Sequence, residues 1–199
     1  MATLLYIHGF NSSPQSSKAQ ATSAWLARER PLIEYVCPLL SPFPKLAMAV
    51  LEQEIGALNG EVYLVGSSMG GFYATWLAEK YGHRAVLINP AVTPWLGADH
   101  LLGEQVNYHN GERHCFGPEH LAQLRAYAVG ELSRPQNLWA LMQTGDEVLD
   151  YRLALGYYRH CSLTVEEGGD HGFQGYERFL PAILDFFTDA SGRSGDGAP

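Results

Sequence analysis

The sequence predicts an α/β fold in which a mostly parallel sheet of about six strands is flanked by helices. Short apolar runs alternate with longer segments of helical periodicity along most of the 199 residues. The apolar runs are almost continuous in Val, Leu, Ile and Tyr, which is typical of strands covered on both faces. Strict alternation of strands and helices favours a parallel sheet. With 46% hydrophobic residues, the chain can bury one core, and we expect a single domain over residues 1–190.

Each element follows from its own pattern. Six apolar runs predict the strands, which are 3–9, 33–40, 61–67, 84–91, 137–145 and 161–169. The segments between them carry apolar residues at helical spacing, which predicts helices at about 17–28, 45–58, 70–81, 151–160 and 175–189. The parallel arrangement then requires the carboxyl ends of all six strands to meet at one edge of the sheet.

One segment interrupts this alternation. Residues 92–135 are too long for an ordinary connection and too mixed in composition for a single helix, so we expect an insertion that acts as a lid or cap. The last residues, 191–199, are small, polar and rich in Gly, which predicts a disordered tail.

Charge and composition exclude several classes of partner. The net charge is −8 with only 13 Lys and Arg, so we expect no nucleic-acid partner, because binding phosphates needs clustered cations. No run approaches the length of a membrane span, and the chain begins directly in an apolar strand pattern, so we expect no membrane partner and a cytoplasmic protein. The three cysteines lack a C-x-x-C spacing and predict neither a disulfide framework nor a zinc site.

Chemically active residues follow the predicted strands. A serine, a carboxylate and a histidine all lie just beyond strand ends, together with a His-Gly-Phe turn and an Asn-Pro pair; the residues are His8, Ser68, Asn89, Asp146 and His171. Because parallel strands end at a common edge, we expect these residues to surround one crevice.

The stretch GSSMG (66–70) matches G-x-S-x-G, in which a serine occupies a strained turn between a strand and a helix. The glycines Gly66, Gly70 and Gly71 are explained if a Cβ at those positions would collide with neighbouring backbone. A simple turn capped by serine would explain one glycine only. The context therefore predicts that Ser68 is an exposed nucleophile.

A serine hydroxyl needs a base, and the base needs an acid that fixes its tautomer. We expect His171, in the glycine-flanked loop EGGDHGF, to be the base. We expect Asp146 to be the acid, with Asp150 as the competitor, although Asp150 is better suited to cap the helix that follows it. Glu147 is expected to face solvent, and Asp170 is too close in sequence to bond its neighbour's imidazole.

The reaction also needs two N–H donors where negative charge develops. We expect the main-chain N–H groups of Met69, directly after the serine, and Phe10, directly after the first strand, to form this oxyanion hole. His8 is expected to shape this loop by hydrogen bonds and not to carry protons itself.

The insertion contains residues that allow two further interpretations. Four histidines suggest a metal, but they lack the spacing of a metal motif, so we expect no metal site; they are His100, His109, His114 and His120. Four aromatic residues either line or cover an acyl pocket or serve in ordinary packing; they are Trp95, Tyr108, Phe116 and Tyr127.

Together these residues resemble the α/β-hydrolase superfamily and, more closely, the YqiA-like esterases. The resemblance is carried by LLYIHGFNSSP (4–14), GSSMGGFYATWLA (66–78), NPAV (89–92), QTGDEVLDYR (143–152) and EGGDHGF (167–173). It implies a reduced α/β-hydrolase fold with esterase or thioesterase activity on short acyl groups. It also implies the same roles for Ser68, Asp146, His171, Phe10 and Met69.

We therefore expect a serine hydrolase that cleaves small carboxylic esters or thioesters through an acyl-enzyme on Ser68, with no cofactor and no metal. Two alternatives remain open at this point. One is an acyltransferase or a carbon–carbon bond hydrolase that uses the same three residues. The other is a catalytically silent α/β-hydrolase that serves as a binding module.

Overall fold

The computed structural model of the chain describes residues 2–107 and 109–189. Its main sheet contains β1 (Thr3–Ile7), β2 (Glu34–Val36), β3 (Val62–Ser67), β4 (Arg84–Ile88), β7 (Leu138–Gln143) and β8 (Ser162–Glu166). All neighbouring pairs are parallel, in the order β2-β1-β3-β4-β7-β8. The six strands expected from the sequence are therefore present, and they form the parallel sheet of the predicted fold class.

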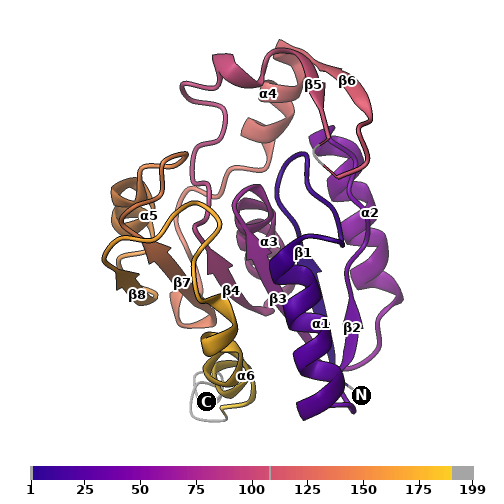
Figure 1. Cartoon of the computed structure of the whole chain (residues 1–199), viewed down its shortest axis with the longest axis vertical. Coiled ribbons are helices and arrows are strands. Elements are labelled where there is room, and N and C mark those ends of the chain that lie inside the picture. The colour runs from indigo at the N-terminus through magenta and orange to yellow at the C-terminus, as the bar shows by residue number, and fades with distance from the viewer. Residues whose placement is uncertain (1, 108, 190–199) are drawn as a thin grey trace, which may run out of the picture.

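Helices cover both faces of this sheet (Figure 1). The helices of the main domain are α1 (Ser17–Glu29), α2 (Pro44–Ala57), α3 (Met69–Tyr81), α5 (Tyr151–Tyr157) and α6 (Leu180–Thr188). Buried side chains of α2, α3 and α5 belong to one apolar cluster, whereas those of α1 and α6 belong to the other. The sheet is thus the middle layer of three.

The alternation of side chains along a strand explains why the central strands are almost entirely apolar, whereas the edge strands β2 and β8 also contain exposed polar residues. In β1, Leu5 and Ile7 point into the cluster beneath α2 and α3, whereas Leu4 and Tyr6 point into the cluster beneath α1 and α6. All four side chains are buried. A strand between two helical layers needs apolar residues at every position, because successive side chains face opposite layers.

Several element boundaries differ from those expected. Strand β2 ends at Val36 instead of residue 40, because Pro38 cannot donate a hydrogen bond to a sheet. The expected helix at 175–189 is a 3₁₀ turn, Tyr176–Phe179, followed by α6. Gly175 there has a φ of 69°, and Pro181 lies in the first turn of α6, where its missing N–H costs nothing.

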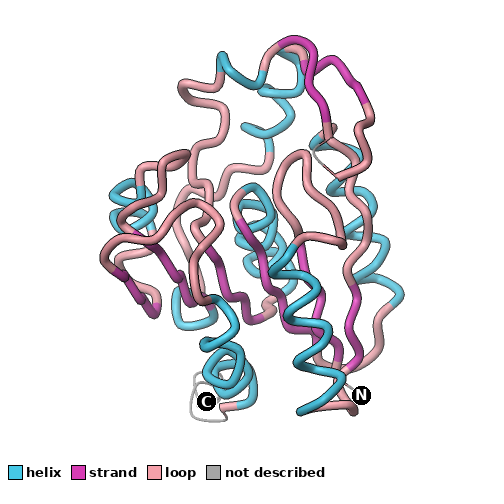
Figure 2. The backbone as a smooth tube through the Cα atoms, viewed as in Figure 1, coloured by secondary structure: helices cyan, strands magenta, loops and turns pink. Residues whose placement is uncertain are grey.

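The segment 92–135 lies above the carboxyl ends of the strands (Figures 1 and 2). It contains a 3₁₀ turn, Asp99–Leu101, the antiparallel hairpin of β5 (Gly103–Val106) and β6 (Arg113–Phe116), and the helix α4 (Pro118–Ala126). Buried Phe116 and Leu124 join it to the main core. The tail expected to be disordered, 191–199, lies outside the described residues. No helix in the described part of the chain is long and apolar enough to span a membrane.

Candidate active site

Ser68 lies at the sharp turn between β3 and α3. Its φ of 56° and ψ of −119° place a non-glycine residue in a sparsely populated region of backbone space. Its main chain is held there from two sides, because its N–H donates to the Ile88 oxygen at 2.9 Å and its carbonyl accepts from the Ala91 N–H at 3.1 Å. Strain of this kind persists only where the surroundings impose it.

The surrounding glycines permit this turn. A Cβ on Gly66 would overlap the carbonyl group of Gly70, and a Cβ on Gly70 would overlap the carbonyl oxygen of Ile7. A Cβ on Gly71 would lie 2.8 Å from the Cβ of Pro90. Glycine is needed at each position because strand, turn and helix approach too closely for any side chain.

The structure brings Ser68, His171 and Asp146 into one hydrogen-bonded chain. The Nε2 atom of His171 lies 2.9 Å from the Oγ atom of Ser68. The Nδ1 atom of His171 lies 2.9 Å from both carboxylate oxygens of Asp146. These residues are up to 103 positions apart in sequence, and they meet because β3, β7 and β8 end at one edge of the sheet.

Asp146 is held as an ionised acceptor. Burial would by itself raise its pKa, but hydrogen bonds from His171 and from the main-chain N–H groups of Leu149 and Val148 outweigh burial and lower the pKa. Its side chain is only 2% exposed. A carboxylate of this kind fixes the imidazole with a proton on Nδ1 and leaves Nε2 free to accept one from the serine.

The neighbouring carboxylates serve other contacts. Asp150 accepts a hydrogen bond from the N–H of Arg152 and caps α5, as expected. Asp170 bonds Gln174 and not the imidazole. Glu147 is exposed, as expected, and its Oε2 also accepts a hydrogen bond from the main-chain N–H of His171 at 3.0 Å.

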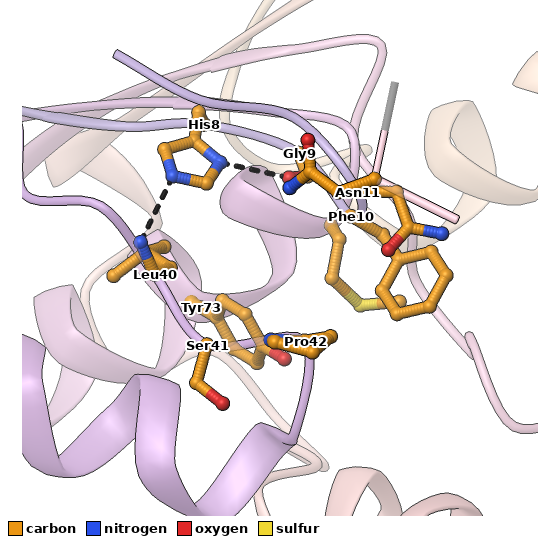
Figure 3. A pocket seen from close by; sticks show the side chains of 10 residues that line it. His8, Gly9, Phe10, Asn11, Leu40, Ser41, Pro42 and Tyr73 are labelled. Atoms are coloured by element: carbon orange, nitrogen blue, oxygen red, sulfur yellow. Dashed lines mark hydrogen bonds between the residues drawn. The ribbon is translucent and has the colours of Figure 1, made fainter. Parts of the chain in front are cut away.

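His8 anchors the loop after β1 (Figure 3). Its Nε2 accepts a hydrogen bond from the N–H of Leu40 at 3.0 Å, so its Nδ1 carries the proton and donates to the Gly9 oxygen at 2.9 Å. Burial lowers the pKa of His8, and the bond to Gly9 offsets this only in part. The neutral ring therefore ties the loop that contains Phe10 to the segment after β2.

Phe10 and Met69 line the same cavity as Ser68. Neither of their main-chain N–H groups donates a turn, loop or cap hydrogen bond to another described main-chain group. Met69 is the first residue of α3, where N–H groups have no partner within the helix. Both groups are thus available to an oxygen atom placed beside the serine.

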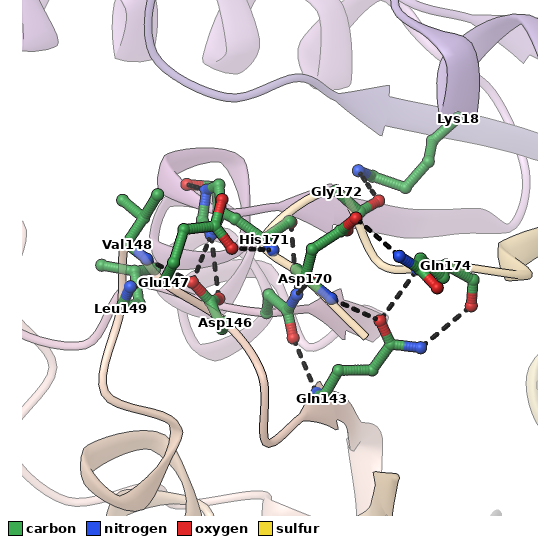
Figure 4. Close-up of polar contacts among 12 residues, drawn as sticks. Lys18, Gln143, Asp146, Glu147, Val148, Leu149, Asp170, His171, Gly172 and Gln174 are labelled. Carbon is green, nitrogen blue, oxygen red and sulfur yellow. Dashed lines mark hydrogen bonds and ion pairs between the residues drawn. The ribbon is translucent and has the colours of Figure 1, made fainter. Parts of the chain in front are cut away.

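Two buried amides hold the loop that carries His171, and neither contact was predicted from the sequence; Figure 4 shows the one from Gln143. Asn89, after β4, donates from Nδ2 to the main-chain oxygens of Asp170 and His171 at 3.0 and 3.2 Å. Gln143, at the end of β7, accepts at Oε1 from the main-chain N–H groups of Asp170 and Gln174. Asn89 was noticed at a strand end, but the sequence contained no signal that pairs it with this loop.

A cavity of about 640 Å³ opens above Ser68 and His171. Of the two roles left open for the aromatic residues of the insertion, the three that the structure describes serve in packing and do not line this cavity. Trp95 packs on Phe72, Phe116 on Phe10, and Tyr127 on Trp76, while Tyr108 lies outside the described residues. The wall is aliphatic instead, formed by Val92, Leu96, Leu101, Val148, Leu149 and Leu153. The aromatic rings attach the insertion to the main domain.

The histidines of the insertion do not gather. His100 lines the cavity, whereas His114 packs edge-on against Phe10 and Phe43. His120 accepts a hydrogen bond from the N–H of Gly117. In the described part of the chain, no group of three or more His, Cys, Asp or Glu residues is arranged to hold a metal ion.

The chain matches one family model and resembles several solved structures. The model of the family UPF0227, described as an uncharacterised protein family, matches residues 3–188. A candidate hydrolase from Agrobacterium vitis S4 superimposes with a TM-score of 0.71 at 22% identity, over 94% of this chain and 88% of that one.

Two further solved structures share the fold. One is Est1E from Butyrivibrio proteoclasticus with ferulic acid bound (TM-score 0.69, 14% identity, 94% of this chain and 88% of that one). The other is mouse alpha/beta hydrolase domain-containing protein 10 (TM-score 0.70, 16% identity, 92% of this chain and 88% of that one). These likenesses show that the chain has the α/β-hydrolase fold.

Proposed function

The chain belongs to the UPF0227 family, and we propose that it is a serine hydrolase that cleaves carboxylic esters or thioesters of short acyl groups. The family match confirms the resemblance noted in the sequence. The observation that carries the proposal is the pair of 2.9 Å contacts that join Ser68 to His171 and His171 to Asp146. An activated serine of this kind performs acyl transfer without a cofactor or a metal.

In the first half of the reaction, Ser68 Oγ attacks the carbonyl carbon of the substrate while its proton passes to Nε2 of His171. The carbonyl oxygen becomes an oxyanion, which accepts hydrogen bonds from the main-chain N–H groups of Phe10 and Met69; each such donor contributes about 3 kcal/mol. Asp146 stabilises the imidazolium that forms and keeps its own negative charge.

The intermediate then collapses. The carbonyl re-forms, the bond to the leaving alcohol or thiol breaks, and His171 gives its proton to that leaving group. Water enters, loses a proton to His171 and attacks the acyl carbon. The second intermediate releases the carboxylic acid as Ser68 recovers its proton from His171. The groups are thus returned to their starting state.

The cavity wall supports an acyl group as the part of the substrate held beside Ser68. Val92 and Leu101 come from the insertion, and Leu149 and Leu153 come from the segment after Asp146. Burial of apolar substrate surface against them contributes about 25 cal/mol per Å². Est1E, which shares this fold, binds ferulic acid, a carboxylic acid, and this supports the same direction.

Hydrolysis of a short-chain nitrophenyl ester tests the proposal. Ser68→Ala should lower kcat by about 10⁴-fold or more, whereas Ser162→Ala, at an exposed position at the start of β8 and outside the cavity, should retain most of the activity. Near wild-type turnover by Ser68→Ala would contradict the proposal. Product analysis with and without an acceptor alcohol separates hydrolysis from acyl transfer. A protein that cleaves no ester or thioester of a substrate panel would instead favour the binding module.

A further inference from the structure

The cavity above Ser68 has two chemically different walls. The insertion and α5 supply the mainly aliphatic wall described above, which also includes Thr93 and His100. The opposite wall comes from the loop after β1 and the start of α1, and it carries polar groups; these are Ser12, Ser16 and Lys18, with Tyr6 and Ser67 below them. An ester has two halves, one on each side of the scissile bond. A divided cavity therefore suits an ester whose two halves differ in polarity.

Lys18 is the one lysine or arginine among the described residues that line this cavity. Its Nζ donates a hydrogen bond to the main-chain oxygen of Gly172 at 2.7 Å (Figure 4). Gly172 directly follows His171, so the ammonium group lies beside the loop that carries the imidazole. An ammonium group has three N–H donors, and this contact uses one of them.

The charge of Lys18 is not neutralised by an ion pair. None of the ion pairs recorded among the described residues includes it. Asp146 and Asp170 lie close enough to favour its charged form, but burial is the larger effect and lowers its pKa. Asp146 is bonded to His171, and Asp170 to Gln174. The chain thus bears the cost of partly burying a cation that has no carboxylate partner.

The other polar groups of the cavity wall do not offset the charge of Lys18. The hydroxyl of Tyr6 is buried beside the side chain of Ser67. The carboxylate of Asp150, which also lines the cavity, is paired with Arg152 at 2.7 Å. Of the described Lys, Arg, Asp and Glu residues that line the cavity, Lys18 is therefore the one without an ion pair, in a chain whose net charge is −8.

We propose that Lys18 is a specificity-determining residue that binds an anionic group, a carboxylate or a phosphate, on the leaving half of the ester. The leaving half is the relevant one because His171 must protonate it, and Lys18 touches the residue next to His171. The acyl half then lies against the aliphatic wall. This inference rests on the proposed hydrolase function and adds to it the charge of the substrate.

The test compares two aryl esters of similar shape, one anionic and one neutral, which are butanoyloxybenzoate and butanoyloxybenzamide, each as its para and its meta isomer; other differences between the leaving groups cancel because each variant is compared with the wild type on the same ester. The acyl group is the same in both esters. For each ester, kcat/KM is measured in the wild type and in Lys18→Gln, which gives the factor by which the substitution lowers it. The factor for the benzoate is then compared with the factor for the benzamide. Lys45→Gln, which removes the same charge from an exposed position on α2 outside the cavity, is the matched control. Lys18→Arg keeps the charge.

Lys18→Gln should lower kcat/KM for at least one benzoate isomer about tenfold more than for the matching benzamide, as expected for a charge-assisted hydrogen bond. Lys18→Arg should preserve most of the preference, and Lys45→Gln should leave it unchanged. An equal loss for both esters would show that Lys18 only holds Gly172, and no loss for either would exclude it from binding; both results overturn this inference alone. Failure of the wild type to cleave the neutral benzamide ester or any other ester would instead overturn the hydrolase function.

Discussion

The Nδ2 atom of Asn89 lies 3.2 Å from the main-chain oxygen of His171 and 3.0 Å from that of Asp170. Its Oδ1 atom accepts from the N–H of Gln143 at 3.0 Å. One buried amide thus connects the end of β4, the end of β7 and the loop that carries the imidazole. The position of that imidazole therefore depends on a side chain that does not take part in the reaction.

Asn89→Asp tests this dependence. The substitution keeps the shape and the acceptor oxygen, but it places a second oxygen against the two carbonyls that Nδ2 now satisfies. Unfavourable contacts of this kind cost about 1–3 kcal/mol, so kcat for ester hydrolysis should fall about ten- to a hundredfold, with a smaller change in KM. The measurement is the rate of hydrolysis at saturating ester concentration. If the Asn89→Asp variant is folded and its kcat is unchanged, Asn89 does not position the imidazole.

Asp146 and Asp150 provide a matched pair of carboxylates. Asp146→Asn should lower kcat about 10⁴-fold, because an amide cannot fix the required imidazole tautomer. Asp150→Asn should lower kcat less than about tenfold, because Asp150 caps α5 and bonds Arg152; asparagine also caps helices well. Steady-state kinetics of both variants would refute the assignment if Asp150→Asn were the more damaging change.

The turn at Ser68 depends on glycine at position 70. Gly70→Ala should lower the free energy of unfolding by about 3 kcal/mol or more, because its Cβ would overlap the Ile7 carbonyl. Gly56→Ala is the control: apart from its chain neighbours and the backbone of its own helix, no described atom lies within 4 Å of a Cβ there, and alanine in a helix should add about 0.5–1 kcal/mol. Urea unfolding gives both values. Equal stabilities of the two variants would mean that the turn is not as crowded as described.

His8 predicts a pH dependence of stability. Burial places its pKa in the folded chain below its ordinary value of 6.5. Once the pH falls toward about 6.5 and below, the unfolded chain therefore binds more protons at this residue than the folded chain does. The free energy of unfolding should therefore decrease as the pH falls from 7.5 to 5.5, by at most about 1.4 kcal/mol per pH unit for this one group.

His8→Gln removes this titration while offering an oxygen acceptor to the N–H of Leu40. Other buried histidines also titrate, so the comparison is between the slopes of the two proteins, measured by urea unfolding at each pH. The wild type should lose more stability on acidification than the variant. Parallel slopes would contradict a neutral, buried His8.

Much of the fold was predictable from local pattern, because the central strands of the sheet are buried on both faces and are apolar at almost every position. The turn at Ser68 was predictable from the G-x-S-x-G pattern, and the contact that requires Gly66 is local, because a Cβ there would overlap Gly70. The contact that requires Gly70 is with Ile7 on a different strand, and only the pattern indicated it. Local patterns also indicated that Asp150 would cap a helix, which the structure confirms.

The parts that were missed depend on contacts between distant segments. The amide of Gln143 meets the loop of His171 across 31 positions, and Lys18 meets Gly172 across 154. Neither contact leaves a pattern in the sequence near either residue. The aromatic residues of the insertion were assigned partly to the pocket because composition alone cannot tell a wall from a packing contact.

The most direct test of the account is covalent labelling by a fluorophosphonate, followed by mass spectrometry of the digested protein. The account predicts one adduct, on the peptide that contains Ser68, and strongly slowed labelling in His171→Ala, because the serine needs that imidazole to lose its proton. An adduct on another residue, no adduct, or a labelling rate unaffected by His171→Ala would contradict it.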